Sequence, residues 1–256
     1  MPVIIKGKMI SHKNPTVCIP VTETGRQEIL DKIGELVADG IEMIEWRIDH
    51  YEDNADIEKV KDLLGSIRPI VKDTIFLATY RTKSQGGQVE FPGEPEMCDY
   101  YEAIARTHTA DIIDVEFFGF TRPTDIIAKI QSLGACVLTS HHDFNETPRV
   151  PVMQTTLERM LEADADIVKL AVMPTKPSDV LDLLKVTDSF LSEHPGFPII
   201  TISMGGLGVL SRISGELFGS CVTFGAVGAV SAPGQMQVDE LKQAISFIHK
   251  YSGDWQ

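Results

Sequence analysis

Apolar and β-branched residues recur along the chain in short runs, which alternate with segments of helical periodicity. Each run spans four to seven residues, the usual length of a buried strand and too short for an ordinary helix. The runs are Val17–Val21, Met43–Ile48, Ile75–Arg81, Ile112–Phe117, Cys136–Ser140, Ile167–Val172, Ile199–Ser203 and Val222–Gly225.

Between these strands, apolar residues spaced three and four positions apart predict amphipathic helices. In Glu28–Ala38, for example, Ile29, Ile33 and Leu36 lie on one apolar stripe. The other predicted helices are Ile57–Ile67, Tyr100–Arg106, Thr124–Leu133, Thr155–Ala163, Pro177–Leu191 and Val238–Tyr251.

Eight strands that alternate with helices predict an α/β fold, a single-domain (β/α)8 barrel over residues 1–256. A doubly wound open sheet remains the alternative, because its strands and helices alternate too. Ahead of the first barrel strand, two apolar pairs flank Lys6-Gly7-Lys8. This pattern predicts a β-hairpin in residues 1–12, which we expect to close the bottom of the barrel.

Five successive predicted strands carry ionisable side chains on one face. The outward face of a barrel strand packs on helices and must be apolar, so Trp46 points outward and Glu45 and Arg47 point inward. The same alternation turns these residues inward: Asp49, Thr79, Arg81, Asp114, Glu116, Ser140, His142 and Lys169. Because barrel enzymes carry their chemistry at the carboxyl ends of the strands, we expect an active site there.

Lys169 lies in the middle of the apolar strand Ile167–Val172. Taken alone, it fits a side chain whose ammonium group reaches solvent past the strand end. Among the other inward charges, burial and repulsion from Arg47 and Arg81 are expected to lower its pKa. A neutral lysine amine condenses with a ketone to an iminium, which stabilises a neighbouring carbanion.

His142 is the predicted proton carrier, because an imidazole takes up and returns a proton near neutral pH. The alternative is a metal ion held by His142, Asp114 and Glu116. A lone inward histidine among cations is a poor site for a divalent metal, so we expect no metal.

The composition of the chain argues against some classes of partner and favours one cellular compartment. The formal net charge of −14 argues against a nucleic-acid partner, which requires a basic patch. The four cysteines have no CxxC spacing and fit a reducing compartment. We find no signal segment and no apolar run of membrane-spanning length, so we expect a cytoplasmic protein with no membrane partner.

The last third of the chain contains two glycine-containing loops. Ser203–Gly208 follows the seventh strand and opens a short helix bearing Arg212, so it fits either a phosphate-binding turn or a simple tight turn. Gly225–Gln235 follows the eighth strand and has Ser231 and Gln235 as polar tips. Its small residues suit a closing lid or an ordinary mobile connection.

Six segments, in order, resemble the type I 3-dehydroquinase family over nearly the whole chain. They are Glu45-Trp46-Arg47, Arg81 with Gly86-Gly87, Ser140-His141-His142-Asp143-Phe144, Lys169-Leu170-Ala171-Val172-Met173-Pro174, Ser203-Met204-Gly205 and Ser231-Ala232-Pro233-Gly234-Gln235. The resemblance implies dehydration of 3-dehydroquinate to 3-dehydroshikimate, the third step of the shikimate pathway. It also implies that no metal or organic cofactor is needed and that the protein is a homodimer.

The resemblance also implies residue roles. Lys169 matches the Schiff-base lysine, and His142 matches the general acid and base. Arg212 with Ser231 and Gln235 matches the group that binds the substrate carboxylate and forms the lid. Glu45, Arg47 and Arg81 match the positions that hold the ring hydroxyls.

One catalytic position departs from the family pattern. Gln85 precedes the paired glycines where the family usually has a glutamate that orients and tunes the catalytic histidine. An amide can donate and accept hydrogen bonds but carries no charge, so we expect a lower pKa for His142 than in glutamate-containing relatives. This predicts a more acidic pH optimum or a slower turnover.

Two other functions fit the same residues. A class I aldolase also forms an iminium on a strand lysine, and the Gly205-Gly206 turn suits its phosphorylated sugar or keto-acid substrates. A barrel that binds the ligand without turnover, because of Gln85, is the non-enzymatic alternative. Arg212 favours a planar carboxylate over a phosphate ester, because a guanidinium matches a carboxylate with two parallel hydrogen bonds.

Overall fold

The computed structural model describes residues 3–252 and divides the chain into two compact units. The arginine unit consists of residues 20–141 and 160–166. The lysine unit consists, within the described range, of residues 3–19, 142–159 and 167–252.

Eight strands form one sheet, in the order β10, β3, β4, β5, β6, β7, β8, β9. The order follows the chain, and the last strand pairs with the first in parallel, so the order never reverses as it does in a doubly wound sheet. The (β/α)8 class is therefore confirmed. The strands are β3 (Thr16–Val21), β4 (Met43–Arg47), β5 (Ile75–Thr79), β6 (Ile112–Glu116), β7 (Cys136–Asp143), β8 (Ile167–Val172), β9 (Ile199–Ser203) and β10 (Val222–Phe224).

An antiparallel hairpin precedes them, formed by β1 (Val3–Ile5) and β2 (Lys8–Ile10). Lys6 and Gly7 make the turn with positive φ angles of 50° and 75°, a conformation that glycine adopts without strain. The predicted hairpin is thus confirmed.

Each predicted helix is present, with differences only at its ends, and so is the short helix predicted to bear Arg212. The helices are α1 (Arg26–Ala38), α2 (Ile57–Ile67), α3 (Glu94–Ala105), α4 (Pro123–Ser132), α5 (Val150–Glu162), α6 (Pro177–Glu193), α7 (Val209–Ile213), α8 (Gly215–Phe218) and α9 (Val238–Ser252). The sequence pattern misses α8, because four residues are too few to show a stripe. None of the helices in the described range is long and apolar enough to cross a membrane.

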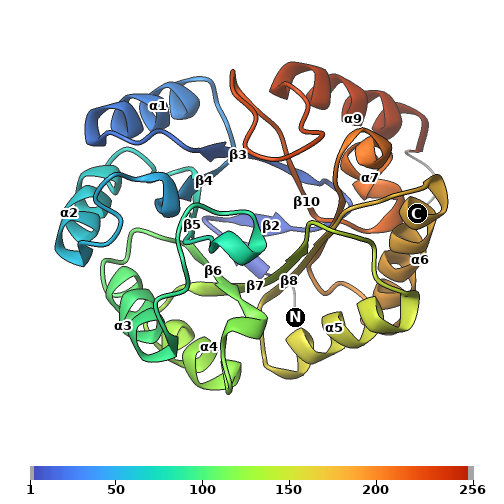
Figure 1. Cartoon of the computed structure of the whole chain (residues 1–256). Helices are drawn as coiled ribbons and strands as arrows, with labels where there is room; N and C mark the ends of the chain where they lie inside the picture. The colour runs from blue at the N-terminus through green and yellow to red at the C-terminus, as the bar shows by residue number, and fades with distance from the viewer. Residues whose placement is uncertain (1–2, 253–256) are drawn as a thin grey trace. The chain divides into compact units, whose positions relative to one another are not determined.

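In the arginine unit, β4, β5 and β6 are buried at every position. Their outward faces carry large apolar side chains such as Trp46 and Phe76, both fully buried. Figure 1 shows α1 to α4 following one another along the outside of these strands. The apolar stripes of the helices and the outward residues of the strands form the core of this unit, which leaves the inward face for polar residues.

In the lysine unit, β8 and β9 pair in parallel, with Lys169 opposite Ile200. All residues of both strands are buried, and α6 and α7 pack against β9. Figure 1 shows α6 and α7 beside each other, in the yellow-to-orange part of the chain.

Candidate active site

Arg81 is the centre of a buried polar network in the arginine unit. Its Nη2 donates to Oδ2 of Asp114 at 2.5 Å, and its Nη1 donates to Oε1 of Glu116 at 3.2 Å and to Oγ of Ser140 at 2.8 Å. The Ser140 hydroxyl in turn donates to Oδ1 of Asp114 at 2.6 Å. Burial alone lowers the pKa of Arg81, but the neighbouring carboxylates outweigh it and raise the pKa above the ordinary value. The guanidinium is therefore permanently charged and fixed in place.

Strand register brings these partners together. Thr79 of β5 lies opposite Asp114 of β6, and Glu116 of β6 lies opposite Ser140 of β7. Arg81 follows two residues after Thr79 on the same face, so its side chain reaches both carboxylates.

Arg47 and Glu45 lie on the same inward face of β4. Asp49 accepts two hydrogen bonds from Arg47, from Nε at 2.8 Å and from Nη2 at 2.7 Å. Oε1 of Glu45 accepts a hydrogen bond from the hydroxyl of Thr79 at 2.8 Å. The three predicted ring-binding residues Glu45, Arg47 and Arg81 are thus all buried, and each is held by a protein group.

Both arginines of this inward face are paired with carboxylates. Arg47 forms an ion pair with Asp49, and Arg81 forms ion pairs with Asp114 and Glu116. The carboxylates therefore offset both guanidinium charges within the arginine unit.

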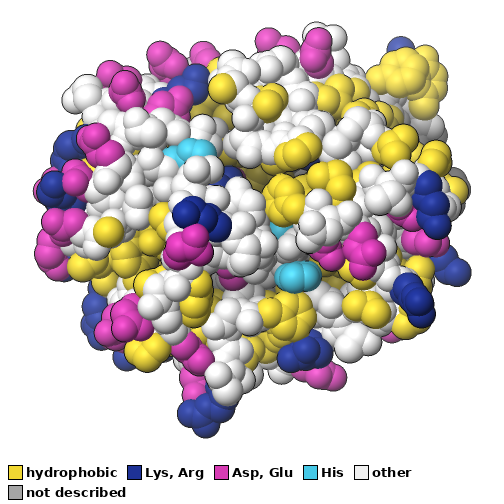
Figure 2. Space-filling view, viewed as in Figure 1, with side chains coloured by type: hydrophobic (Ala, Val, Ile, Leu, Met, Phe, Trp, Pro, Cys, Tyr) yellow, Lys and Arg dark blue, Asp and Glu magenta, His cyan; other side chains and the backbone are white. Residues whose placement is uncertain are grey.

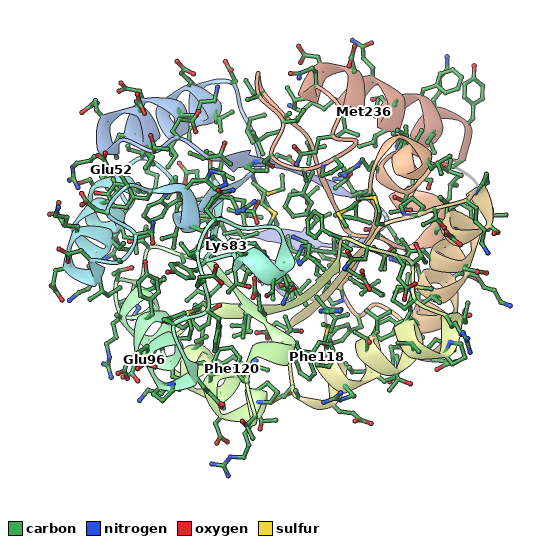
Figure 3. The ribbon with its side chains drawn as sticks, viewed as in Figure 1. Glu52, Lys83, Glu96, Phe118, Phe120 and Met236 are labelled. Carbon is green, nitrogen blue, oxygen red and sulfur yellow. The ribbon has the colours of Figure 1, made fainter. Side chains whose placement is uncertain are left out.

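Gln85 ends the 3-10 turn η2 (Lys83–Gln85), whose position Lys83 marks in Figure 3, and it is only 8% exposed. Gly86 continues the turn with φ of 83°, and the amide of Gly87 donates to the carbonyl of Thr82 at 2.8 Å. A Cβ atom at position 87 would overlap the carbonyl of Arg81, so the close approach requires glycine there. The glycine pair therefore holds a buried amide in a tight turn.

Lys169 lies in β8 of the lysine unit and is 4% exposed. Its Nζ lies 4.2 Å from the centre of the Phe224 ring, at the end of β10. The ring face favours the ammonium form, in opposition to the effect of burial. The sequence assigned no role to Phe224, although an aromatic residue at the carboxyl end of a barrel strand is a usable signal.

His142 lies near the end of β7 and is partly exposed. Its ring stacks on Phe144, with 6.4 Å between the ring centres and 21° between the planes. An imidazole at a strand end with access to solvent suits proton exchange.

Arg212 lies in α7 and is almost fully buried. Its Nη2 donates to the carbonyl of Pro233 at 2.8 Å, whereas its buried Nε has no hydrogen-bond partner among residues 3–252. Burial lowers the pKa of Arg212 to about 10, so the side chain still carries a charge at neutral pH. A buried N–H without a partner is costly, and an incoming carboxylate would satisfy it.

Ser231 and Gln235 are hydrogen-bonded to each other in the loop after β10. Oε1 of Gln235 accepts from the amide of Ser231 at 2.8 Å, and Nε2 donates to the Ser231 hydroxyl at 2.9 Å. The same loop contacts the glycine turn after β9, where the amide of Gly205 donates to Pro233 at 3.1 Å. A Cβ atom at Gly234 would overlap the carbonyl of Gly205. The loop therefore has a defined conformation beside Arg212.

The predicted site residues divide between the two units. Glu45, Arg47, Arg81 and Gln85 belong to the arginine unit, and Lys169, His142, Arg212, Ser231 and Gln235 belong to the lysine unit. Asp114, Glu116 and Ser140, expected from the sequence to point inward, hold Arg81.

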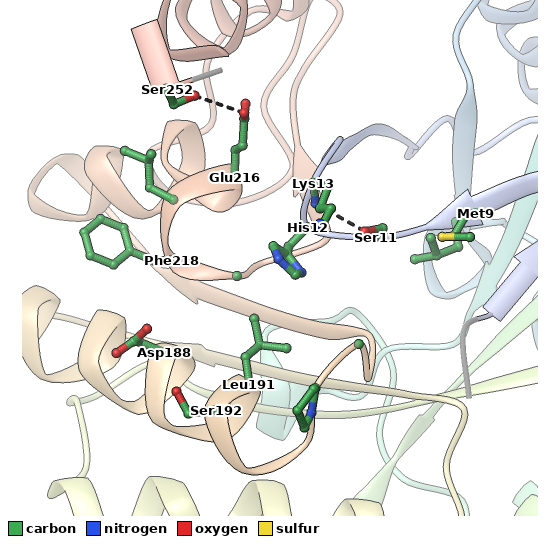
Figure 4. Close-up of a pocket in the computed structure, with 15 residues that line it drawn as sticks. Met9, Ser11, His12, Lys13, Asp188, Leu191, Ser192, Glu216, Phe218 and Ser252 are labelled. Atoms are coloured by element: carbon green, nitrogen blue, oxygen red, sulfur yellow. Dashed lines mark hydrogen bonds between the residues drawn. The ribbon is translucent and has the colours of Figure 1, made fainter. Parts of the chain in front are cut away.

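A separate cavity of about 830 Å³ lies in the lysine unit, between the segment after β2, the end of α6 and α8 (Figure 4). Its walls include His12, Leu191, Phe218 and Ser252. None of the predicted site residues is among the residues that line it, so it is not the candidate active site.

The described residues contain one group of acidic and histidine side chains close enough to share a metal ion: Glu158, Glu193 and His194, at the surface. The alternative metal site at His142, Asp114 and Glu116 is not favoured, because Arg81 already binds both of these carboxylates. On the face seen in Figure 2, basic side chains are scattered among acidic ones and form no stripe for nucleic acid.

Comparison with known proteins gives a consistent result. Residues 17–252 match the sequence profile of Type I 3-dehydroquinase. A 3-dehydroquinate dehydratase of Clostridium botulinum is 38% identical over 247 residues, which are 96% of this chain and 97% of the relative.

Two solved structures also resemble the chain closely. The 3-dehydroquinate dehydratase of Geobacillus kaustophilus has a TM-score of 0.93 and 32% identity, and the match covers 98% of each chain. The type I enzyme of Clostridium difficile, solved with covalently modified comenic acid, has a TM-score of 0.93 and 35% identity over 98% of this chain and 99% of its own. These matches favour the dehydratase over the aldolase, and the chain belongs to the type I 3-dehydroquinase family.

Proposed function

We propose that Lys169 and His142 carry out the dehydration of 3-dehydroquinate, the reaction of the family to which the chain belongs. The Lys169 amine attacks the ketone carbon, and loss of water gives an iminium. His142 removes a proton from the carbon next to the iminium and gives an enamine. The enamine expels the β-hydroxyl as His142 returns the proton to it, and water then hydrolyses the iminium to release 3-dehydroshikimate and the free amine.

The observation that carries this proposal is the burial of Lys169 in the middle of β8. A charged lysine in an apolar strand costs free energy, and the neutral amine relieves that cost and acts as the nucleophile. No nearby carboxylate is required for the chemistry, because the iminium itself supplies the positive charge that draws electrons from the neighbouring carbon.

We propose that the other predicted residues bind the substrate. The unsatisfied Nε of Arg212 supports a role in binding the substrate carboxylate, with Ser231 and Gln235 as the lid over it. The fixed positions of Glu45, Arg47 and Arg81 support recognition of ring hydroxyls, because rigid side chains lose little entropy on binding.

The test is reduction with borohydride in the presence of 3-dehydroquinate, followed by peptide mass analysis. We expect one reduced adduct, on the peptide that carries Lys169. The matched control is Lys185→Met, which removes an exposed lysine of α6 and should leave the adduct unchanged. An adduct on another lysine, or no adduct, would overturn the proposed role of Lys169.

We propose that Gln85 lowers the basicity of the catalytic histidine relative to enzymes with glutamate at this position. In Gln85→Glu, a carboxylate at the position that in the family tunes the catalytic histidine should raise the pKa of His142. The acidic limb of the kcat profile should then move to higher pH, because the basic form of His142 starts the proton transfer. Gln88→Glu, in the same loop but exposed, serves as the control for the added charge. Superimposable profiles for Gln85→Glu and the parent enzyme would refute this role.

We further propose that the enzyme is a single-domain, cytoplasmic homodimer. The four free cysteines support a reducing compartment. Exposed apolar side chains on the outer helices support self-association, notably Phe247 and Tyr251 of α9, whose rings lie 5.1 Å apart. One chain has a mass of 28.2 kDa, and light scattering of the protein as it elutes from a gel-filtration column should give twice that mass. The mass of a single chain would exclude the dimer.

A further inference from the structure

Asp49 is a fully buried carboxylate that follows the end of β4, in the 3-10 turn η1 (Ile48–His50). Both of its oxygens accept hydrogen bonds from Arg47, the first from Nε and the second from Nη2. This bidentate arrangement fixes the plane of the guanidinium, which a single hydrogen bond would leave free to rotate.

The same two oxygens also bind the backbone of the next strand-to-helix loop. Oδ1 accepts from the amide of Arg81 at 3.3 Å, and Oδ2 accepts from the amide of Gln88 at 3.1 Å. Residues 81 and 88 flank the turn that carries Gln85. One carboxylate therefore connects the side chain of Arg47 to both ends of the loop.

The loop has its own internal bonds, which close a short ring around the turn. The amide of Lys83 donates to the carbonyl of Val89 at 2.7 Å, and Thr82 pairs with Val89 as an isolated bridge. These bonds set the shape of the loop, whereas Asp49 attaches it to β4. Loss of Asp49 should thus free the Gln88 end of the loop without unfolding its turn, because Glu116 still accepts hydrogen bonds from the amide and the hydroxyl of Thr82 at the other end.

Arg47 retains binding capacity after this pairing. Asp49 accepts hydrogen bonds from Nε and Nη2 of Arg47. The remaining nitrogen of Arg47, Nη1, donates to no protein group within residues 3–252. A guanidinium that is held on one side and has a donor left on the other is arranged to bind a hydroxyl or carboxylate oxygen.

We propose that Asp49 is a positioning residue for the dehydration reaction: it aligns Arg47 toward the substrate and holds the 81–88 loop against β4. The proposal rests on the proposed role of Arg47 in binding a ring hydroxyl. Its effect reaches the substrate through Arg47 and the loop, and Asp49 itself does not take part in the chemistry.

The test replaces Asp49 by Asn, which preserves shape but removes the charge and turns one acceptor into a donor. The matched control is Asp111→Asn, because Asp111 also accepts a backbone hydrogen bond in the arginine unit, from the amide of Phe76 at 2.7 Å. We expect KM to rise about 10- to 100-fold in Asp49→Asn and to change less than about twofold in the control. Asp49→Glu, which keeps the charge but lengthens the side chain, should raise KM too and serves if Asp49→Asn fails to fold.

Two further readouts separate positioning from general destabilisation. Hydrogen exchange at the Gln88 amide should become faster in Asp49→Asn and stay slow in Asp111→Asn. In a double-mutant cycle, Asp49→Asn should raise KM much less when Arg47 is already Met, because the side chain it aligns is gone.

The outcomes distinguish this inference from the proposed function. If the parent enzyme forms the Lys169 adduct but both Asp49 variants keep the parent KM, the positioning role is refuted and the reaction stands. An equal rise in KM with and without Arg47 would also refute it. If the parent enzyme forms no adduct, the proposed function fails, while the exchange of the Gln88 amide still tests the attachment of the loop.

Discussion

Replacing Asp114 by Asn would test whether charge pairing fixes Arg81. Asp114 accepts from Arg81 through Oδ2 and from Ser140 through Oδ1, so both oxygens are engaged and buried. Asparagine has only one acceptor oxygen, so its NH2 group would face either the guanidinium or the hydroxyl. Removing one partner of a buried ion pair costs about 3–5 kcal/mol of unfolding free energy. Because Glu116 still binds Arg81, we expect a loss near the lower end, about 3 kcal/mol.

The assay is equilibrium unfolding in urea, with the free energy taken from the midpoint and slope. Ser140→Ala is the matched comparison, since it removes one hydrogen bond to each partner but no charge, and it should cost about 1–2 kcal/mol. Losses of equal size in the two variants, or a loss below about 1 kcal/mol in Asp114→Asn, would refute the charge-pairing explanation.

Three further predictions test other parts of the molecule. Arg212→Met should raise KM by about tenfold or more in steady-state assays, because it removes the buried donors proposed to bind the substrate carboxylate. An unchanged KM would exclude this role of Arg212. Gly87→Ala should destabilise the fold by about 2 kcal/mol or more in thermal unfolding, since the added Cβ would overlap a backbone carbonyl. Gly34→Ala in α1 should instead stabilise the fold by about 0.5–1 kcal/mol, because nothing lies near the added methyl group. Burial lowers the pKa of His50 below 6.5. The contribution of His50 to folding stability is therefore complete above about pH 6.5 and falls as the pH drops toward the folded-state pKa. An NMR titration of the imidazole that gives a pKa above 6.5 would contradict this.

The strands and most helices were predictable because each carries its own periodic pattern. β8 coincides with the predicted run Ile167–Val172, and α2 coincides with Ile57–Ile67. The ends differ where tertiary contacts decide them. α3 starts at Glu94, six residues before the predicted Tyr100, because its first turn has one buried apolar residue, Met97, and so shows no stripe.

The buried network around Arg81 was predictable as a set of residues but not as a set of interactions. Strand alternation correctly grouped Arg81, Asp114 and Glu116, since it depends only on counting residues along each strand. Which carboxylate binds which guanidinium depends on the register between strands and on turns such as η1, and neither leaves a pattern in the sequence. For that reason the bidentate pairing of Arg47 by Asp49 was not anticipated.

The arginine unit and the lysine unit stabilise their buried cations in different ways. Two guanidiniums in the arginine unit, Arg47 and Arg81, are matched with three carboxylates, so this cluster carries no excess positive charge. In the lysine unit, the ring of Phe224 favours the ammonium form of Lys169. Burial acts in the opposite direction and favours the neutral amine that the reaction requires. It follows that polar substitutions in the apolar surroundings of Lys169 should impair the formation of the Schiff base.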